Sequence, residues 1–401
     1  MRVLLINPSW GGRVQGRRYN RAWPPLDLLN TAALLREDGF DVSLRDSRAT
    51  GVLPEDISEE IAGVDRVLLT TSPLDRWQCP NLDLAPLMEW TNAIPAEKLI
   101  LCGAHGTIFP EAIMQTTGAG LVLRGEPEAS APALLRSLRR GESLLLADVS
   151  SLSYVWEGRI LHKDDAQPVD LSALPLPAYD LTDPARYGYE LLGQRLAVLE
   201  TSRGCPHRCI YCLKAMYGPS VRMKPTAQVV REIEQVAELG YRHVYFIDLE
   251  FCMNRDRVLE ICRAMMKHRL EWCCQTRADS VDPKLLGEMA SAGCRLIHYG
   301  IESGGQNGRD RIQKRLSDRR IEEALRWTRA AGMATAGFFL FGFPWETPSD
   351  WSHTEALAKQ LNPTYASFHL VTPYPGTELA VATGNERPWW ETAPSSKRVG
   401  R

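Results

Sequence analysis

The first 140 residues alternate short apolar runs with segments whose apolar positions repeat at helical spacing. Apolar runs bounded by Gly, Pro and Asn are typical of buried parallel strands, and helix-period segments between them indicate βαβ units. In chain order, the apolar runs and helix-period segments are RVLLINP, LDLLNTAALLREDG, DVSLRDS, DRVLLTTS, EKLILCG, GLVLRGE and APALLRSL. This pattern predicts a doubly wound α/β domain over residues 1–140. Its ligand-binding loops would follow the strands, at NPSW, TSPLDRWQCP, GAHGTIFP and RGEPEAS.

Residues 141–194 carry a weaker pattern. SYVWEGRILHKDD predicts a hairpin that turns at Glu157-Gly158, and the Pro-bearing DLSALPLPAYDL predicts an extended linker.

A second βα series then begins, with apolar runs at RLAVLETS, HVYFIDLEF, EWCCQTRADS, LIHYGIES, ATAGFFLFGFP and ASFHLVTPYPG. Six strands separated by amphipathic helices predict a partial (β/α)6 barrel over residues 195–380, with its active site at the carboxyl ends of the strands. Residues 381–401 would form a short tail.

Composition narrows the classes of partner. With 44% apolar residues, 24% charged residues and a net charge of -2, the chain has the makeup of a soluble globular protein. No charge excess favours nucleic acid or an acidic membrane as a partner. The amino terminus, MRVLLINPSW, holds an apolar run of only four residues, far short of a secretory or membrane-spanning segment. We therefore expect a cytoplasmic protein, in which a tight cysteine cluster favours a metal or redox site over disulfides.

Three of the ten cysteines lie within the segment GCPHRCIYC, at Cys205, Cys209 and Cys212. Three thiolates on one metal centre leave a coordination position open for chemistry, whereas four ligands would close it. The alternatives are a structural zinc site completed by His207 and thiols without a special role. They are disfavoured because zinc cysteines usually come as two spaced pairs. Five other cysteines are expected to be buried apolar residues without a chemical role, namely Cys252, Cys262, Cys273, Cys274 and Cys294.

GCPHRCIYC resembles the cluster motif of the radical S-adenosylmethionine (SAM) enzymes. The resemblance continues through FIDLEF, TRADSVD, HYGIESG, FGFPWETPSD and TPYPGTEL and covers residues 195–380. It implies a [4Fe-4S] cluster on the three cysteines, whose open iron binds SAM, and reductive cleavage of SAM to a 5'-deoxyadenosyl radical. The SAM-binding residues that it implies are Tyr211, Asp248, Glu250, Arg277, Glu302 and Ser303. Because Asp248-Leu249-Glu250 stands where many members carry Gly-Gly-Glu, either carboxylate is a candidate for the SAM ammonium group.

The amino-terminal half resembles the Rossmann-like cobalamin-binding domain that often precedes such barrels. The resemblance lies in INPSW, PPLDLLNTAALLREDGFDV, GAHGTIFPEAI and LRGEPEAS. It implies a cobalamin site built from Asn7, Ser72, Arg76, Trp77, Gly103, His105, Thr107, Gly125 and Glu126. The sequence has no DxHxxG signature, so we expect no histidine ligand of that type, and Arg76-Trp77 are the candidates for the lower face of the ring. His105 is more often, in such a turn, a hydrogen-bonding loop residue than a cobalt ligand.

Together the two resemblances imply a cobalamin-dependent radical SAM enzyme that methylates an unactivated carbon through a 5'-deoxyadenosyl radical and methylcobalamin. They imply a small-molecule, carrier-bound or peptide-presented substrate and an external electron donor of the flavodoxin or ferredoxin type. A dehydratase, cyclase or rearrangement enzyme on the same scaffold, with or without cobalamin, is the alternative. A noncatalytic cluster-bearing sensor is a further one. A methylthiotransferase is disfavoured because only Cys79 and Cys102 occur in the first half.

Overall fold

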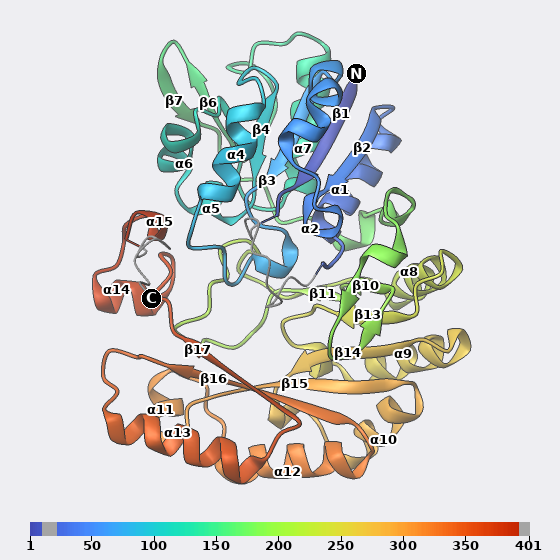
Figure 1. The fold of residues 1–401 in the computed structure, drawn as a ribbon, viewed down its shortest axis with the longest axis vertical. Coiled ribbons are helices and arrows are strands. Elements are labelled where there is room, and N and C mark those ends of the chain that lie inside the picture. The colour runs from blue at the N-terminus through green and yellow to red at the C-terminus, as the bar shows by residue number, and fades with distance from the viewer. Residues whose placement is uncertain (10–21, 393–401) are drawn as a thin grey trace. The chain divides into compact units, whose positions relative to one another are not determined.

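The computed structural model describes residues 1–9 and 22–392, and it divides into two compact units (Figure 1). The first unit comprises Met1–Tyr187, Leu213–Gly218 and the described part of the segment from Glu386 onward. The second comprises Gly188–Cys212 and Pro219–Asn385. The chain therefore passes between the units four times. The sequence pattern had instead predicted two consecutive domains joined by a linker over residues 141–194.

A seven-stranded sheet forms the centre of the first unit, in the order β2-β1-β3-β4-β5-β6-β7. The first five strands are parallel, and β6 and β7 are antiparallel to their neighbours. This order changes direction between β1 and β3, which is the usual ligand site of a doubly wound sheet. The strands are β1 (Arg2–Asn7), β2 (Asp41–Asp46), β3 (Arg66–Thr70), β4 (Leu99–Cys102), β5 (Leu121–Leu123), β6 (Leu152–Trp156) and β7 (Arg159–His162).

Helices cover both faces of this sheet. Helices α1 (Leu26–Glu37) and α7 (Pro127–Arg139) pack together on one face, as Figure 1 shows. On the other face, alternate strand residues such as Leu4 and Ile6 form a core with α3, α4 and α6. The remaining helices of the unit are α2 (Ser47–Thr50), α3 (Ser58–Gly63), α4 (Ala85–Ala93), α5 (Ala104–Ile108), α6 (Pro110–Thr117) and α15 (Trp389–Thr392).

The β6–β7 hairpin lies inside the stretch that the sequence pattern assigned to a linker. Its turn falls at Glu157-Gly158, as predicted, and both residues have positive φ angles, +47° and +75°. Two such residues suit the right-handed twist of the flanking strands. Because β6 pairs with β5 along Leu121–Leu123, the hairpin extends the first sheet. The Pro-bearing stretch that follows is also anchored, since Leu171 and Tyr179 are buried.

Six parallel strands form the sheet of the second unit, in the order β10-β13-β14-β15-β16-β17. The strands are β10 (Leu196–Leu199), β13 (His243–Phe246), β14 (Glu271–Thr276), β15 (Cys294–Glu302), β16 (Ala334–Phe341) and β17 (Tyr365–Leu370). All six match the apolar runs of the second series. Two short ladders pair β8 (Gly188–Tyr189) with β9 (Gly193–Gln194), and β11 (Ser202–Arg203) with β12 (Arg222–Met223).

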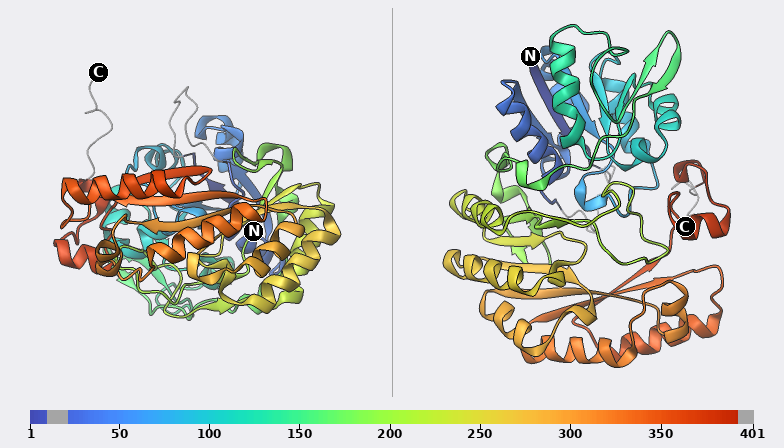
Figure 2. Two further views of the ribbon diagram at one scale, coloured as in Figure 1. Left: turned by 90° about the horizontal axis from the view of Figure 1, so that it is seen from below. Right: turned by 180° about the vertical axis from the view of Figure 1, so that it is seen from behind.

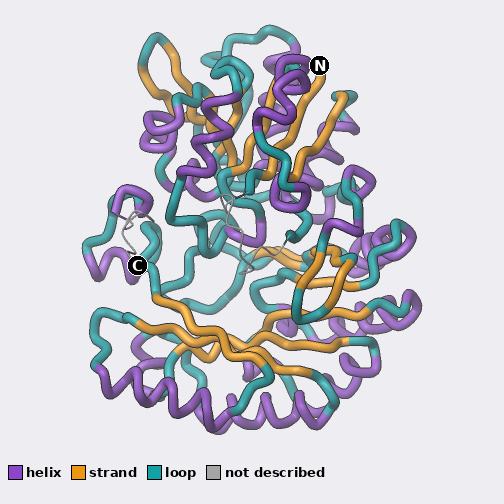
Figure 3. The backbone as a smooth tube through the Cα atoms, in the orientation of Figure 1, coloured by secondary structure: helices purple, strands orange, loops and turns teal. Residues whose placement is uncertain are grey.

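Helices alternate with these strands, and the tubes of Figure 3 and the rear view of Figure 2 show them along one face of the sheet. They are α8 (Thr226–Glu238), α9 (Arg255–His268), α10 (Pro283–Ser291), α11 (Gln306–Arg311), α12 (Asp318–Ala330) and α13 (Pro348–Leu361). Helix α14 (Glu378–Thr383) follows β17 and lies apart from this row (Figure 1). Because β10 and β17 are edge strands, the barrel is open. The doubly wound sheet and the partial (β/α)6 barrel are thus confirmed. Within residues 1–9 and 22–392, no helix is long and apolar enough to cross a membrane.

Candidate functional site

The cysteine segment follows β10 and β11 directly. Gly204 has a φ of +91°, and a Cβ on it would lie 2.7 Å from the carbonyl oxygen of Ser220, so this turn requires glycine. The loop then carries Cys205, Cys209 and Cys212, all partly exposed and none in a disulfide. Its backbone is held from within, because the Cys212 N–H donates to the Cys209 carbonyl at 3.2 Å.

The three thiols supply the donor set of a cluster, although they are not gathered as ligands. Throughout the described ranges, no three His, Cys, Asp or Glu side chains are arranged to hold a metal ion. Three thiols on one short, partly exposed loop nevertheless fit a [4Fe-4S] cluster chemically, since thiolates are its usual ligands. Ligation would require the loop to draw its thiols together.

Asp248 and its neighbours hold the chain that leads to Cys205. The Asp248 carboxylate follows β13 and accepts hydrogen bonds from the Thr201 N–H at 2.9 Å, the Thr201 hydroxyl at 2.6 Å and the Ser202 hydroxyl at 2.6 Å. It is buried, and burial raises its pKa. Asp248 therefore fixes the strand-to-loop junction in this structure.

A buried ion network continues this junction. Glu200 receives two hydrogen bonds from Arg203, at 2.9 and 2.8 Å, and Lys224 donates to Glu232 at 2.7 Å. Burial disfavours the charge of Glu200, but Arg203 and then Lys224 lower its pKa below the ordinary value. Buried charges that are paired in this way hold a defined backbone geometry.

Glu250 is also engaged by the strand ends around it. Its carboxylate accepts from the Thr276 hydroxyl at 2.6 Å and from the Arg277 N–H at 3.1 Å, and burial raises its pKa. The Arg277 guanidinium lies against Asp279, with two contacts of 2.9 Å, and donates to the Lys314 carbonyl at 2.9 Å. Its remaining nitrogen, Nη1, is buried and has no hydrogen-bond partner in the part of the chain that the structure describes.

Glu302 ends β15 in a left-handed conformation, with a φ of +71°. It pairs with Lys314 at 3.1 Å and hydrogen-bonds the Tyr211 hydroxyl of the cysteine loop. Burial and then the charge of Glu302 raise the pKa of Tyr211 well above its usual value. Ser303 is buried, and a Cβ on Gly308 would lie 2.3 Å from its hydroxyl. Tyr211, Glu302 and Lys314 thus form one cluster next to the cysteines.

A basic pocket of about 360 Å³ opens beside this cluster. Its lining comes from the cysteine loop, the turn after β14 and the loop after α11, as Pro206, His207, Arg208, Arg277, Asp279, Gln313, Lys314 and Arg315. Four Arg and Lys residues face one Asp, so the pocket suits an anionic group such as a carboxylate. Lys314 and Arg315 were not predicted as site residues, because IQKRLSD follows no strand pattern that would place it here.

The carboxyl edge of the first sheet holds a second group of polar residues. Asn7, at the end of β1, donates from Nδ2 to Asp46 at 2.9 Å, and Tyr187 donates to the other Asp46 oxygen at 3.0 Å. Burial raises the pKa of Asp46 to about 6. The Asn7 Oδ1 atom is buried and has no hydrogen-bond partner among the described residues.

The loop after β3 is built around Ser72 and Trp77. The fully buried Trp77 indole donates to the Ser72 carbonyl at 3.1 Å, and the Ser72 hydroxyl accepts from the Ala104 N–H at 2.7 Å. Gly103 has a φ of +105°, and a Cβ there would lie 2.7 Å from the Thr71 hydroxyl. Trp77 is thus a core residue of this loop, whereas the neighbouring Arg76 side chain is 36% exposed.

His105 lies in the interior, with an exposed fraction of 0%. Its Nε2 atom is 2.9 Å from the Asn81 carbonyl oxygen, and the rings of Trp389 and Trp390 lie 5.0 and 5.3 Å away. Burial lowers the pKa of His105 to about 4, so the imidazole is neutral. In this structure His105 is a hydrogen-bonded loop residue.

The last three residues predicted at this edge join neighbouring loops. The Thr107 hydroxyl donates to the Gly103 carbonyl at 2.9 Å and accepts from the Gly125 N–H at 2.8 Å. Glu126 accepts from the Val169 N–H at 2.7 Å. Their hydrogen bonds hold the edge together, and a Cβ on Gly125 would meet no other atom within 4 Å.

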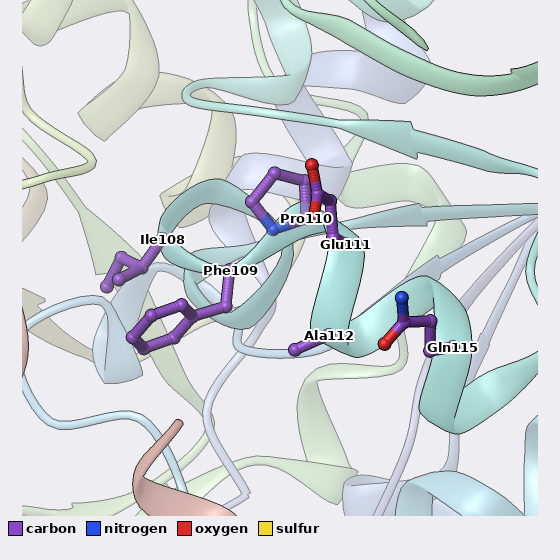
Figure 4. Close-up of a pocket in the computed structure, with 6 residues that line it drawn as sticks. All are labelled: Ile108, Phe109, Pro110, Glu111, Ala112 and Gln115. Carbon is purple, nitrogen blue, oxygen red and sulfur yellow. The ribbon is translucent and has the colours of Figure 1, made fainter. Parts of the chain in front are cut away.

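A shallower pocket of about 320 Å³ lies at the turn between α5 and α6 (Figure 4). Its lining residues are Ile108, Phe109, Pro110, Glu111, Ala112 and Gln115, which were not predicted as site residues. The one carboxylate among them, on Glu111, lies 3.2 Å from the His162 imidazole. This pocket brings together no set of catalytic groups.

The chain is similar to two groups of named proteins along most of its length. An uncharacterised methyltransferase of Pyrococcus horikoshii is 27% identical over 385 residues, which cover 94% of this chain and 82% of the relative. The anaerobic magnesium-protoporphyrin IX monomethyl ester cyclase of Rubrivivax gelatinosus is 24% identical over 408 residues, which cover 96% and 70%.

A solved structure and a family model agree on the architecture. The radical S-adenosylmethionine methyltransferase TsrM of Kitasatospora setae, with cobalamin and a [4Fe-4S] cluster bound, superposes with a TM-score of 0.74 at 19% identity. The superposition covers 95% of this chain and 74% of that one, and it shows a shared fold. Residues 199–358, from the end of β10 into α13, match the radical SAM superfamily. The second unit of this chain therefore contains a radical SAM domain.

Proposed function

We propose that this chain is a cobalamin-dependent radical SAM enzyme that methylates an unactivated carbon of a small-molecule or natural-product intermediate. The observation that carries the proposal is the three-thiol loop of the radical SAM domain, set beside the basic pocket of Arg208, Arg277 and Lys314. The fusion of this domain to a doubly wound sheet supports the cobalamin part.

Cys205, Cys209 and Cys212 would hold the [4Fe-4S] cluster. When bound, the cluster and SAM supply the electron and the carbon-centred radical, and cobalamin carries the methyl group. Cys209 lies close enough to the Arg277 and Lys314 side chains to interact electrostatically with both. Burial disfavours the charge of Lys314, but Glu302 and then Cys209 raise its pKa, so the ammonium group is kept.

The charged end of SAM would be bound by the residues around the basic pocket. The buried Nη1 of Arg277 offers a hydrogen-bond donor to the carboxylate of SAM, and Lys314 adds a second cation. The Glu302 carboxylate would accept from the SAM ammonium group, with Tyr211 holding its orientation. Asp248, Glu250 and Ser303 would instead keep the strand ends in place, since the structure already engages the two carboxylates and the Ser303 carbonyl in hydrogen bonds of the scaffold.

Cobalamin would bind at the switch point between β1 and β3 of the first unit. The buried oxygens of Asn7 and Thr71 have no hydrogen-bond partner within the described residues, so a polar ligand would gain bonds there at little cost. Gly103 lets the backbone approach closely. Arg76 would lie at the lower face of the ring, and His105 would not, because its nitrogen already contacts Asn81. We expect a base-off corrinoid without a histidine ligand.

Anaerobic reconstitution tests the cluster. The protein should bind about four irons and four sulfides and cleave SAM to 5'-deoxyadenosine under reduction. Cys209→Ala should abolish that cleavage, and Cys79→Ala, which removes an exposed thiol outside the loop, should not. Continued 5'-deoxyadenosine formation by Cys209→Ala would contradict the cluster assignment.

Substrate chemistry separates methylation from its main alternative. The 24% identity with a cyclase over 96% of this chain favours a radical cyclisation as the second candidate. With methyl-labelled SAM and hydroxocobalamin, a methyltransferase transfers the label to product, whereas a cyclase forms 5'-deoxyadenosine without labelled product. The genes adjacent to this one would indicate the substrate, whether it is carrier-bound, and the flavodoxin- or ferredoxin-type electron donor.

A further inference from the structure

The six residues that follow the cysteine loop belong to the first unit. Cys212 is the last residue of its stretch in the second unit, and Leu213–Gly218 packs with the first. Leu213 is 0% exposed, Met216 is 2% and Tyr217 is 5%. One peptide bond therefore separates the third thiol of the motif from a buried anchor in the other unit.

Tyr217 anchors this segment on Trp77. The two ring centroids are 5.4 Å apart, and the ring planes meet at 64°, an edge-to-face contact of the favourable kind. Trp77 is fully buried, and its indole donates to the Ser72 carbonyl. Ser72 in turn accepts from the Ala104 N–H. The ring of Tyr217 thus packs against Trp77, the residue around which the loop after β3 is built.

The path of the segment leaves it little freedom. The Tyr217 N–H donates to the Lys214 carbonyl at 3.0 Å, which closes a turn. Gly218 then has a φ of +72°, and a Cβ on it would lie 2.9 Å from the Pro168 ring. A turn and the close approach of Gly218 to Pro168 therefore hold the segment that joins Cys212 to Tyr217.

We propose that Tyr217 is a positioning residue that couples the cysteine loop to the loop of residues 71–78 through its contact with Trp77. Gathering the three thiols on a cluster restricts Cys212, and the restriction extends through Leu213–Gly218 to Trp77 and Ser72. The identity of the cofactors rests on the proposed function: the cluster would order one edge of the corrinoid site. By linkage, corrinoid binding would favour the ligating form of the cysteine loop to the same extent.

Amide hydrogen exchange of residues 71–78 tests the coupling without any corrinoid. In the wild-type protein, anaerobic cluster assembly should slow this exchange about fivefold, the scale of one aromatic pair. Tyr217→Leu should abolish the slowing at unchanged iron content, and Tyr217→Phe, which keeps the ring, should preserve it. Tyr154→Leu removes another buried tyrosine ring of the first unit and serves as the matched control, which should keep the slowing.

Two results would overturn the coupling: unchanged exchange of residues 71–78 in the fully reconstituted wild-type protein, or slowing that persists in Tyr217→Leu. If Tyr217→Leu fails to fold, Trp77→Phe tests the same contact from the other side and should weaken the slowing. A wild-type protein that shows the slowing but retains no hydroxocobalamin would contradict only the cobalamin part of the proposed function. If no cluster assembles, the cluster proposal fails. The coupling then requires that the amide hydrogens of residues 71–78 exchange faster in Tyr217→Leu than in Tyr217→Phe.

Discussion

Replacing His105 with glutamine should remove an acid sensitivity that this imidazole imposes on the first unit. Burial lowers its pKa from 6.5 to about 4, and hydrogen bonds to the Asn81 and Thr71 backbone only partly offset this. The unfolded chain takes up the proton first as the pH falls. The stabilisation by His105 is therefore complete above pH 6.5 and is lost as the pH falls through about 4. At about 1.36 kcal/mol for each pKa unit, the loss is about 3 kcal/mol.

Asp46 has the opposite effect in nearly the same pH range. Burial raises its pKa from 3.8 to about 6, against the charge of Arg48 and a hydrogen bond from Tyr187. The folded unit keeps this proton to higher pH than the unfolded chain does. The stabilisation by the protonated carboxyl is present below pH 3.8 and is lost as the pH rises through about 6. Its size is again about 3 kcal/mol, and screening is weak because the side chain is buried.

The two contributions nearly cancel in the wild-type protein between pH 4 and about 6, so single replacements should reveal them. Relative to wild type, His105→Gln should gain stability as the pH falls through this range, and Asp46→Asn should gain stability as the pH rises. Urea unfolding followed by tryptophan fluorescence measures both differences. Asp46→Asn combined with His105→Gln is the control and should follow the wild-type pH dependence. The reasoning is refuted if the two single variants change with pH in the same direction, or if neither changes.

Three further replacements test the packing around the site. Thr201→Val removes the 2.6 Å hydrogen bond to the buried Asp248 carboxylate and should cost about 1–3 kcal/mol in urea unfolding; an unchanged midpoint would contradict the role of Asp248 in the junction. Gly304→Ala would place a Cβ 2.3 Å from the Thr354 Cα, so the thermal midpoint should fall, whereas Ala at the uncrowded Gly305 should leave it nearly unchanged. Trp389→Ala removes a buried indole that donates to the Asn81 carbonyl at 2.9 Å, so the free energy of unfolding should fall by about 3–5 kcal/mol. Limited proteolysis should then cut the released tail, and protection equal to wild type would show that Trp389 is no anchor.

Local pattern was sufficient to predict the strands and the hairpin turn. The apolar runs of both halves became strands because strand burial is decided within a few residues, and Glu157-Gly158 formed the turn that its composition favours. The path of the chain between the units was not predictable in this way. Leu213–Gly218 continues a motif of the second unit, and no periodicity marks its return to the first. The pairing of β6 with β5 depends on contacts distant in sequence for the same reason.

Contacts distant in sequence also explain the cysteines outside the motif. Cys252, Cys274 and Cys294 come from separate elements, yet Cys274 lies within hydrogen-bonding reach of the other two. Burial raises the pKa of Cys274 well above its usual value and that of the neighbouring Cys262 to about 12. Thiols in this state are neutral and poor metal ligands. The partly exposed loop cysteines lie instead beside Arg277 and Lys314, so environment rather than number separates the two groups of thiols.

The polar residues at the strand ends divide by the same kind of reasoning. A buried carboxylate or hydroxyl must be hydrogen-bonded in the folded chain, whether or not a ligand ever binds. Asp248 and Ser72 meet this requirement through protein partners, so their position at a strand end reflects the scaffold as much as a site. Arg277 Nη1, Asn7 Oδ1 and Thr71 Oγ1 do not meet it within the described residues. A ligand that bonds to Arg277 in the second unit, or one that bonds to Asn7 and Thr71 in the first, would remove a cost that the folded chain otherwise carries. They are therefore better markers of the SAM and cobalamin sites that we propose than the motif residues already engaged in the scaffold.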